Sequence, residues 1–182
     1  MKEIIKQKIK IPEKVEIKAD NGIITIKGEK GEIKRNFISR KIKLKVEENE
    51  IIIFTEGNAT KREKAVAGTF KSHLQNMIKG VTEGHVYKLK ICSGHFPMSV
   101  DVKGDELIVK NFCGESSPRV LKLKKEVDVK LDGNDIIVES VDKELAGQTA
   151  SSIEELTKRP GFDKRRFQDG IYIYNKDGKV IQ

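Results

Sequence analysis

The sequence of 182 residues lacks tryptophan, is poor in proline and histidine, and contains no long run of apolar side chains. A membrane-spanning helix needs roughly 20 predominantly apolar residues in succession, and no segment of this chain comes near that length. The segment Met1–Lys10 alternates charged side chains with isoleucine and lacks the apolar core of a secretory signal. We therefore expect a cytoplasmic protein that has no membrane partner.

Cysteine is also scarce, since Cys92 and Cys113 are the only two. Two cysteines do not make a disulfide framework in an intracellular chain. Cys92 and His95 have the spacing of a metal-ligand pair, but a second close-spaced pair is missing. We interpret both cysteines as small core residues and predict no metal or other cofactor.

Residues arranged for catalysis are missing as well. His73, His85 and His95 have no nucleophile partner in their sequence context, and the chain contains no Gly-x-Ser-x-Gly, phosphate-loop or dinucleotide motif. Paired carboxylates at Glu47/Glu48 and Glu154/Glu155 are simply accounted for by solubility. An active site needs a converging set of such groups, so we predict neither an enzyme nor a small-molecule substrate.

Positive charge, by contrast, is abundant. The net charge of +8 and the isoelectric point near 9.3 favour a polyanionic partner. Residues 1–81 hold 19 Lys/Arg against 11 Asp/Glu, a balance of +8, whereas residues 82–182 hold 17 of each. The segment Lys158–Arg166 nevertheless carries five basic residues and one acidic residue. Both regions are candidates for contact with a polyanion.

The chain also contains an internal duplication. Val15–Lys18 (VEIK) matches Val100–Lys103 (VDVK), and Lys64–Gly68 (KAVAG) matches Lys143–Gly147 (KELAG). Apolar and polar residues alternate in the strand segments of both copies, which is typical of sheets with one covered face. The sequence predicts an α+β fold with two homologous domains, 1–81 and 82–182, each a small antiparallel β-sheet packed against one helix.

Several local signals support these elements. Asn21-Gly22 between alternating runs predicts a tight hairpin. The first helix is expected to begin after a cap at Asn58 or Thr60 and to stop at Gly80. The second is expected from about Asp142 to Lys158. Glycines at the matched helix positions, Gly68 and Gly147, suggest close approach of helix and sheet backbones.

The basic run after the second helix has several features of a binding segment. Pro160-Gly161 predicts a turn, so that the run projects as a loop. Arg165 and Arg166 are adjacent, and each guanidinium engages two phosphate oxygens at once. Gly161 and Gly170 would permit close approach of a backbone. Phe162 or Phe167 would stack on a base, although for Phe167 the favoured interpretation is a core anchor.

Three blocks in order resemble the ribosomal protein L6 family of the large subunit, in its archaeal and eukaryotic form. They are Ile9–Glu32, with IKIP and IKGEKGE, then Ala65–Val81, with AVAGTF and MIKGV, and finally Lys164–Tyr172, KRRFQDGIY. The resemblance covers essentially the whole chain. It implies two homologous α+β domains that bind large-subunit ribosomal RNA near the base of the acidic-protein stalk and the factor-binding region.

The resemblance also implies that the second domain makes the main RNA contact and that neighbouring ribosomal proteins are partners. The loop Ser93–Pro97, which contains His95, corresponds to a glycine-bearing segment of the family. The expected RNA-binding residues are Lys158, Arg159, Gly161, Lys164, Arg165, Arg166, Gly170 and His95. The alternative is a protein–protein adaptor that docks an acidic partner through the basic domain 1–81.

Overall fold

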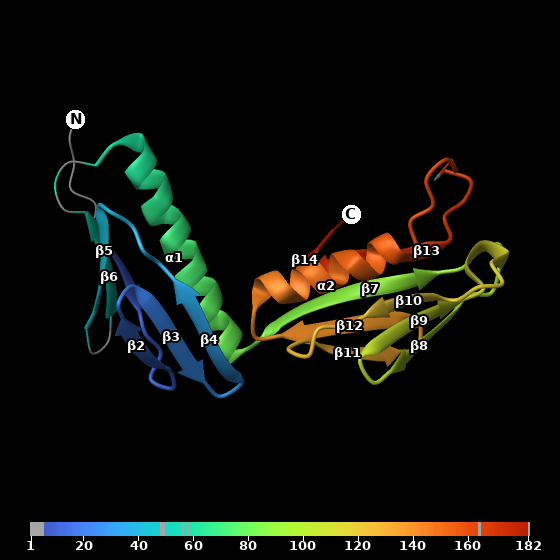
Figure 1. The fold of residues 1–182 in the computed structure, drawn as a ribbon, viewed down its shortest axis with the longest axis horizontal. Coiled ribbons are helices and arrows are strands. Elements are labelled where there is room, and N and C mark those ends of the chain that lie inside the picture. The colour runs from blue at the N-terminus through green and yellow to red at the C-terminus, as the bar shows by residue number, and fades with distance from the viewer. Residues whose placement is uncertain (1–5, 48–49, 56, 58, 164, 182) are drawn as a thin grey trace. The chain divides into compact units, whose positions relative to one another are not determined.

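The computed structural model describes residues 6–47, 50–55, 57, 59–163 and 165–181. The chain forms two compact units, Met1–Gly84 and His85–Gln182 (Figure 1). The domain boundary expected after residue 81 falls inside helix α1 (Lys61–Thr82), whose last turn completes the first unit. Among the described residues, neither helix is both long and apolar enough to cross a membrane.

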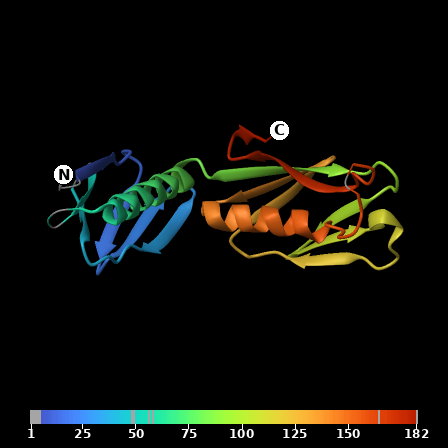
Figure 2. The same cartoon turned by 90° about the horizontal axis from the view of Figure 1, so that it is seen from above.

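The first unit contains two antiparallel three-stranded sheets and helix α1. One sheet has the order β1–β6–β5 and the other the order β2–β3–β4. Figure 2 shows α1 lying along these strands, and it contacts β1, β3, β4 and β6. The strands are β1 (Lys6–Lys10), β2 (Glu16–Asp20), β3 (Ile23–Gly28), β4 (Gly31–Asn36), β5 (Ile42–Val46) and β6 (Glu50–Thr55).

The predicted hairpin at Asn21-Gly22 is confirmed. Asp20 pairs with Ile23 at the end of the β2–β3 ladder, which leaves a two-residue turn. Asn21 and Gly22 have φ angles of 47° and 82°. Positive φ at both central residues is the geometry of the turn whose twist matches that of two antiparallel strands.

Helix α1 begins at the predicted cap and ends later than predicted. The side chain of Glu63 accepts hydrogen bonds from the backbone and side chain of Thr60, which completes a capping box. The alternative cap, Asn58, lies outside the described residues. Gly80 does not stop the helix but is buried within it. The chain leaves the helix at Gly84, whose φ of 80° favours glycine.

The second unit repeats the plan with one three-stranded and one five-stranded sheet. The first has the order β10–β9–β8 and the second the order β11–β12–β7–β13–β14, both antiparallel where paired. Helix α2 (Lys143–Leu156) contacts β7, β10, β12 and β13. The strands are β7 (His85–Cys92), β8 (Ser99–Lys103), β9 (Glu106–Lys110), β10 (Arg119–Lys122), β11 (Asp128–Asp132), β12 (Asp135–Ser140), β13 (Gly170–Lys176) and β14 (Lys179–Val180).

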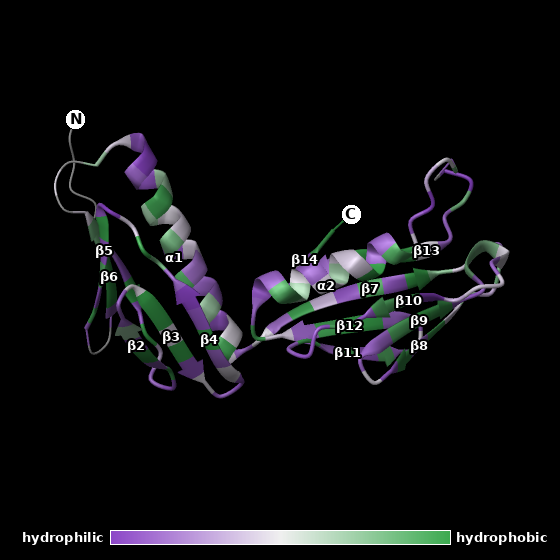
Figure 3. Ribbon diagram, in the orientation of Figure 1, coloured by the Kyte–Doolittle hydropathy of each residue, from purple (hydrophilic) through white to green (hydrophobic). Residues whose placement is uncertain are grey.

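The α+β class and the duplication are confirmed, but each unit has two sheets where one was expected. The sequence did not predict β1, β4, β10 or β14. β4 carries one large apolar residue, Ile33, and β10 is only four residues long. Figure 3 shows the alternation of hydrophilic and hydrophobic residues along the better-patterned strands.

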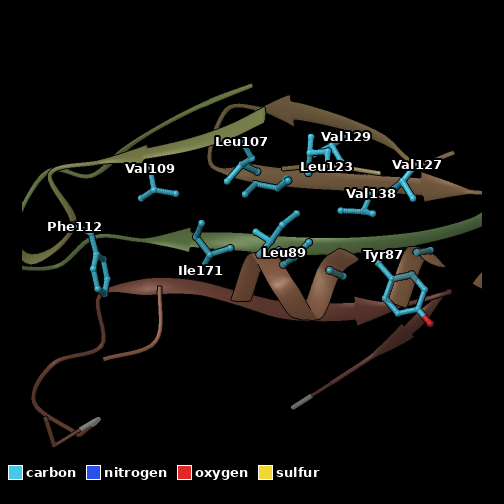
Figure 4. Close-up of a cluster of buried hydrophobic side chains, with 14 residues drawn as sticks. Tyr87, Leu89, Leu107, Val109, Phe112, Leu123, Val127, Val129, Val138 and Ile171 are labelled. Carbon is cyan, nitrogen blue, oxygen red and sulfur yellow. The ribbon is translucent and has the colours of Figure 1, made fainter. Parts of the chain in front are cut away.

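The core of the second unit lies where its two sheets and α2 meet. Leu107 of β9, Leu89 of β7 and Ile171 of β13 are fully buried in one cluster (Figure 4). Each such side chain stabilises the fold by roughly 1.5–3 kcal/mol relative to exposure. Cys113 packs against this cluster while only partly buried, and Cys92 is also partly buried, so neither is a fully enclosed core residue.

The matched helix glycines do not mark close backbone approach, contrary to the sequence interpretation. A Cβ at Gly68 would meet nothing within 4 Å, and one at Gly147 would meet the Tyr87 side chain at 3.3 Å. The close approach lies at Gly28 instead, where a Cβ would sit 2.6 Å from the carbonyl oxygen of Val81. A strand end and a helix end thus touch at a position where only glycine fits.

Candidate nucleic-acid interface

The segment 157–169, here called the basic loop, connects α2 to β13 (Figure 1). Strand β13 pairs antiparallel with β7, and Gly170 lies opposite Cys92. The residues that follow Cys92 therefore lie beside the residues that precede Gly170. This pairing brings His95 and the basic loop, far apart in sequence, to one end of the same sheet.

Asp169 fastens the two segments together. Its Oδ1 accepts hydrogen bonds from the backbone N–H groups of Gly94 and His95, the latter at 3.1 Å, and its Oδ2 lies 3.0 Å from His95 Nδ1. The Asp169 side chain is 3% exposed and that of His95 50% exposed. Burial raises the pKa of Asp169, but the hydrogen bonds from Gly94 and His95 outweigh it and leave the pKa below its ordinary value. The carboxylate is thus charged and holds the imidazole at the surface.

Arg119 fixes the other end of the basic loop. Its guanidinium pairs with both carboxylate oxygens of Glu115, at 2.8 and 2.7 Å, and donates to the carbonyl oxygen of Leu156 at 2.7 Å. It also lies 4.5 Å from the centroid of the Phe112 ring. A cation near the last carbonyls of a helix stabilises that end. Arg119 therefore anchors the point where α2 ends and the loop begins.

Three aromatic side chains stay at the surface beside these anchors. Phe162 and Phe167 are 41% and 39% exposed, and their rings meet edge to face at 5.0 Å. The Arg159 guanidinium lies 4.0 Å from the centroid of Phe162, and the His95 ring lies 5.5 Å from Phe167. Phe96, on the loop with His95, is 45% exposed. The interpretation of Phe167 as a core anchor is therefore wrong, since the ring lies at the surface.

A cavity of about 270 Å³ opens at the base of the basic loop. Its wall combines aromatic rings, carboxylates and cations. The lining residues are Phe112, Cys113, Ser151, Glu154, Glu155, Thr157, Lys158, Arg159, Phe162, Phe167, Asp169, Ile171 and Tyr172.

Two of the predicted cations, Lys158 and Arg159, line this cavity, and Arg165 and Arg166 immediately precede Phe167 in the basic loop. Lys158, Arg165 and Arg166 are exposed, and Arg159 is half-buried. Arg165 pairs with Asp163 through Nε at 3.1 Å and Nη2 at 2.9 Å, which lowers the pKa of Asp163. Such an exposed pair is weak and opens readily for a stronger anion. Lys164, also predicted, lies outside the described residues.

The two predicted glycines differ in their surroundings. Gly161 is exposed, and a Cβ there would meet nothing within 4 Å. Gly170 is buried, and a Cβ there would lie 3.2 Å from the Tyr172 ring. Gly161 is open to a ligand backbone, whereas Gly170 serves the start of β13.

A second cationic surface lies on the first unit. The register of the β1–β6–β5 sheet puts five lysines on one face, around Ile52 and Phe54 of the central strand. Ile52, whose ladder partners are Lys8 and Lys45, is only 6% exposed. These residues, here called the lysine face, are Lys6, Lys8, Lys10, Lys43 and Lys45.

Sequence reasoning missed the two side chains that organise the site, Arg119 and Asp169. Arg119 reaches Leu156, 37 positions away, and Asp169 reaches His95, 74 positions away. Both contacts depend on strand pairing that no local pattern encodes. Among the described residues, no group of three His, Cys, Asp or Glu side chains comes together in a way that would hold a metal ion.

Known proteins match this chain along nearly its whole length. The family model described as ribosomal protein L6 matches residues 11–84 and again residues 96–170, once for each copy of the duplication. A large ribosomal subunit protein uL6 from Methanosarcina mazei is 46% identical over 94% of this chain and 97% of its own length. Proteins of the same name from Nanoarchaeum equitans and Methanococcus vannielii are 45% and 43% identical, each over 98% of this chain and over 96% and 97% of their own lengths.

Proposed function

We propose that this chain, which belongs to the ribosomal protein L6 family and is a ribosomal protein of the large subunit rather than an enzyme, binds large-subunit ribosomal RNA through the basic loop. One observation carries this proposal. Exposed cations and exposed aromatic rings share one end of the second unit and are held there by two anchors, the buried Asp169 and the partly buried Arg119.

The chemistry of this end suits folded RNA. Phosphate oxygens favour arginine and lysine, and unpaired bases stack on aromatic rings or guanidinium planes. The exposed cations Lys158, Arg165 and Arg166 supply the first kind of contact. The exposed rings of Phe162 and Phe167 supply the second. His95, held at the surface by Asp169, adds a polar group beside them.

The binding step is tested by removing two phosphate contacts. Arg165→Ala with Arg166→Ala is expected to weaken binding to a large-subunit ribosomal RNA fragment and to lower the slope of log affinity against log salt by up to about 2, because each lost phosphate contact releases one fewer counterion. The matched control is Lys176→Ala with Lys179→Ala in the β13–β14 hairpin, which removes the same charge at the other end of β7. Equal effects of the two double variants in a filter-binding titration would exclude the basic loop as the contact.

We place the protein in the cytoplasm on the large ribosomal subunit, near the stalk base and the factor-binding region, with neighbouring ribosomal proteins as further partners. The family resemblance supports this location. Co-sedimentation with large subunits through a salt gradient tests the association. Crosslinking from the basic loop on intact subunits tests the site, and crosslinks only to nucleotides remote from the stalk base would contradict it.

A second function is favoured by the lysine face. Five lysines on one sheet face could dock an acidic protein, as an adaptor would. Lys43→Glu with Lys45→Glu in the full chain is expected to abolish capture of an acidic partner and to leave RNA affinity unchanged. If this variant abolishes RNA binding while the Arg165/Arg166 variant does not, the first unit is the RNA contact instead.

A further inference from the structure

The cavity at the base of the basic loop has the size of a small ligand site. Its volume of about 270 Å³ lies just below the roughly 300–1,000 Å³ of typical small-molecule pockets. Such a space admits one flat ring system and excludes a paired RNA helix. Any part of an RNA that enters it must therefore be a single group displaced from the helix.

The charges of the lining residues favour an uncharged base over an anionic phosphate as the occupant of the cavity. Glu154, Glu155 and Asp169 contribute carboxylates to the wall, whereas Lys158 and Arg159 contribute cations where the loop begins. An anionic phosphate is repelled by the carboxylates and attracted to the cations. An uncharged base has no such conflict, and its amino groups are donors that a carboxylate accepts. The occupant that fits this pattern is a base with its phosphate held outside.

The aromatic walls are arranged before any ligand arrives. The Phe162 ring contacts the Phe167 ring edge to face, with centroids 5.0 Å apart, and the Arg159 guanidinium lies 4.0 Å from the Phe162 centroid. Both rings remain about two-fifths exposed, at 41% and 39%, so each keeps a surface on which a base can stack. A guanidinium plane is itself a stacking surface for a base. Rings fixed by their neighbours lose little conformational freedom on binding, which favours affinity.

We infer that this cavity receives one unpaired nucleobase of the RNA whose backbone lies on the basic loop. The inference rests on the proposed function, because it assigns to the same surface a base-specific contact in addition to the phosphate contacts. The cations hold the strand, and the rings select a position where a base is free to leave the helix.

Two kinds of variant test the cavity without touching the phosphate contacts. Phe162→Leu with Phe167→Leu keeps apolar packing and removes the aromatic faces. Ser151→Trp, from an exposed position of α2 that lines the cavity, fills the space and leaves both rings in place. Each is expected to lower affinity for large-subunit ribosomal RNA by about 10-fold or more, the loss typical of one stacked base, without changing the salt slope.

Footprinting of full-length protein on large-subunit ribosomal RNA separates the base contact from the backbone contact. We expect the unaltered protein to protect at least one base from dimethyl sulfate. Both cavity variants should leave that base reactive while they still protect the RNA backbone from hydroxyl radicals. The Arg165/Arg166 variant should lose the backbone protection.

The outcomes are distinct. If both cavity variants protect the same bases as the unaltered protein and keep the backbone footprint, the cavity assignment is wrong and the proposal of RNA binding stands. Absence of any backbone footprint with the unaltered protein overturns the proposed function together with the cavity assignment. Near-UV circular dichroism of each variant confirms that the second unit is folded.

Discussion

Replacement of Arg119 by methionine tests whether this side chain anchors the start of the basic loop. Methionine keeps much of the aliphatic volume and removes the guanidinium. Four interactions disappear: the bidentate pair with Glu115, the hydrogen bonds to the carbonyl oxygens of Leu156 at 2.7 Å and Lys158 at 3.4 Å, and the contact with the Phe112 ring at 4.5 Å. All involve a side chain that is only 25% exposed.

The magnitude follows from the partly buried setting. A hydrogen bond from a charged donor contributes about 1.5–3 kcal/mol, a cation over an aromatic ring about 0.5–1 kcal/mol, and a partly exposed ion pair at most about 1 kcal/mol. These contributions share one side chain and are not additive. We expect Arg119→Met to lower the free energy of unfolding of the second unit by about 2–3 kcal/mol.

Tyrosine fluorescence makes the assay specific to that unit. All three tyrosines, Tyr87, Tyr172 and Tyr174, belong to the second unit, and the chain has no tryptophan. Urea titrations with this signal report the second unit alone. The matched control is Lys110→Met, whose pair with Asp101 is 50% and 43% exposed. A loss for Arg119→Met no larger than for the control would refute the anchor.

The remaining predictions concern glycine packing and acid stability. Gly28→Ala puts a Cβ 2.6 Å from the Val81 carbonyl oxygen and should destabilise the first unit by more than about 1 kcal/mol. Gly68→Ala, with open space around it, should instead stabilise α1 by up to about 1 kcal/mol. Far-UV circular dichroism during urea titration measures both changes in stability, and changes of the same sign would contradict this account. Because the pKa of Asp169 in the folded protein lies below its ordinary value of 3.8, its carboxylate stabilises the fold above that pH, and this contribution is lost as the pH falls through the folded value. Asp169→Asn should therefore lower the stability of the second unit at neutral pH and reduce the further loss of stability in acid, as followed by tyrosine fluorescence. If the acid-induced loss of stability is unchanged in this variant, the prediction is wrong.

Local patterns predicted much of the secondary structure. The Asn21-Gly22 turn and the Thr60–Glu63 capping box involve residues within three positions of each other. Such signals act through backbone geometry and short-range hydrogen bonds, so they are readable in a single sequence. The helix end was predicted wrongly at Gly80 because a buried helical glycine and a terminating glycine look alike without their φ angles.

The sequence predicted the charges of the candidate site but not the contacts that position its residues. The basic run was evident as composition, but Arg165 is already paired with Asp163, and the exposure of Phe167 opposed the core interpretation. Burial of a ring depends on what the rest of the chain packs against it, which no window of sequence contains.

By itself the sequence determined the α+β class, the duplication and the ribosomal protein family, because these follow from periodicity, repetition and ordered motifs along the chain. Only the tertiary structure decided which residues share a surface. The pairing of Cys92 with Gly170 brings His95 to the basic loop, and the hydrogen bonds of Asp169 and Arg119 hold that surface together. These contacts join segments tens of residues apart, so they stabilise the protein only after the strands have paired.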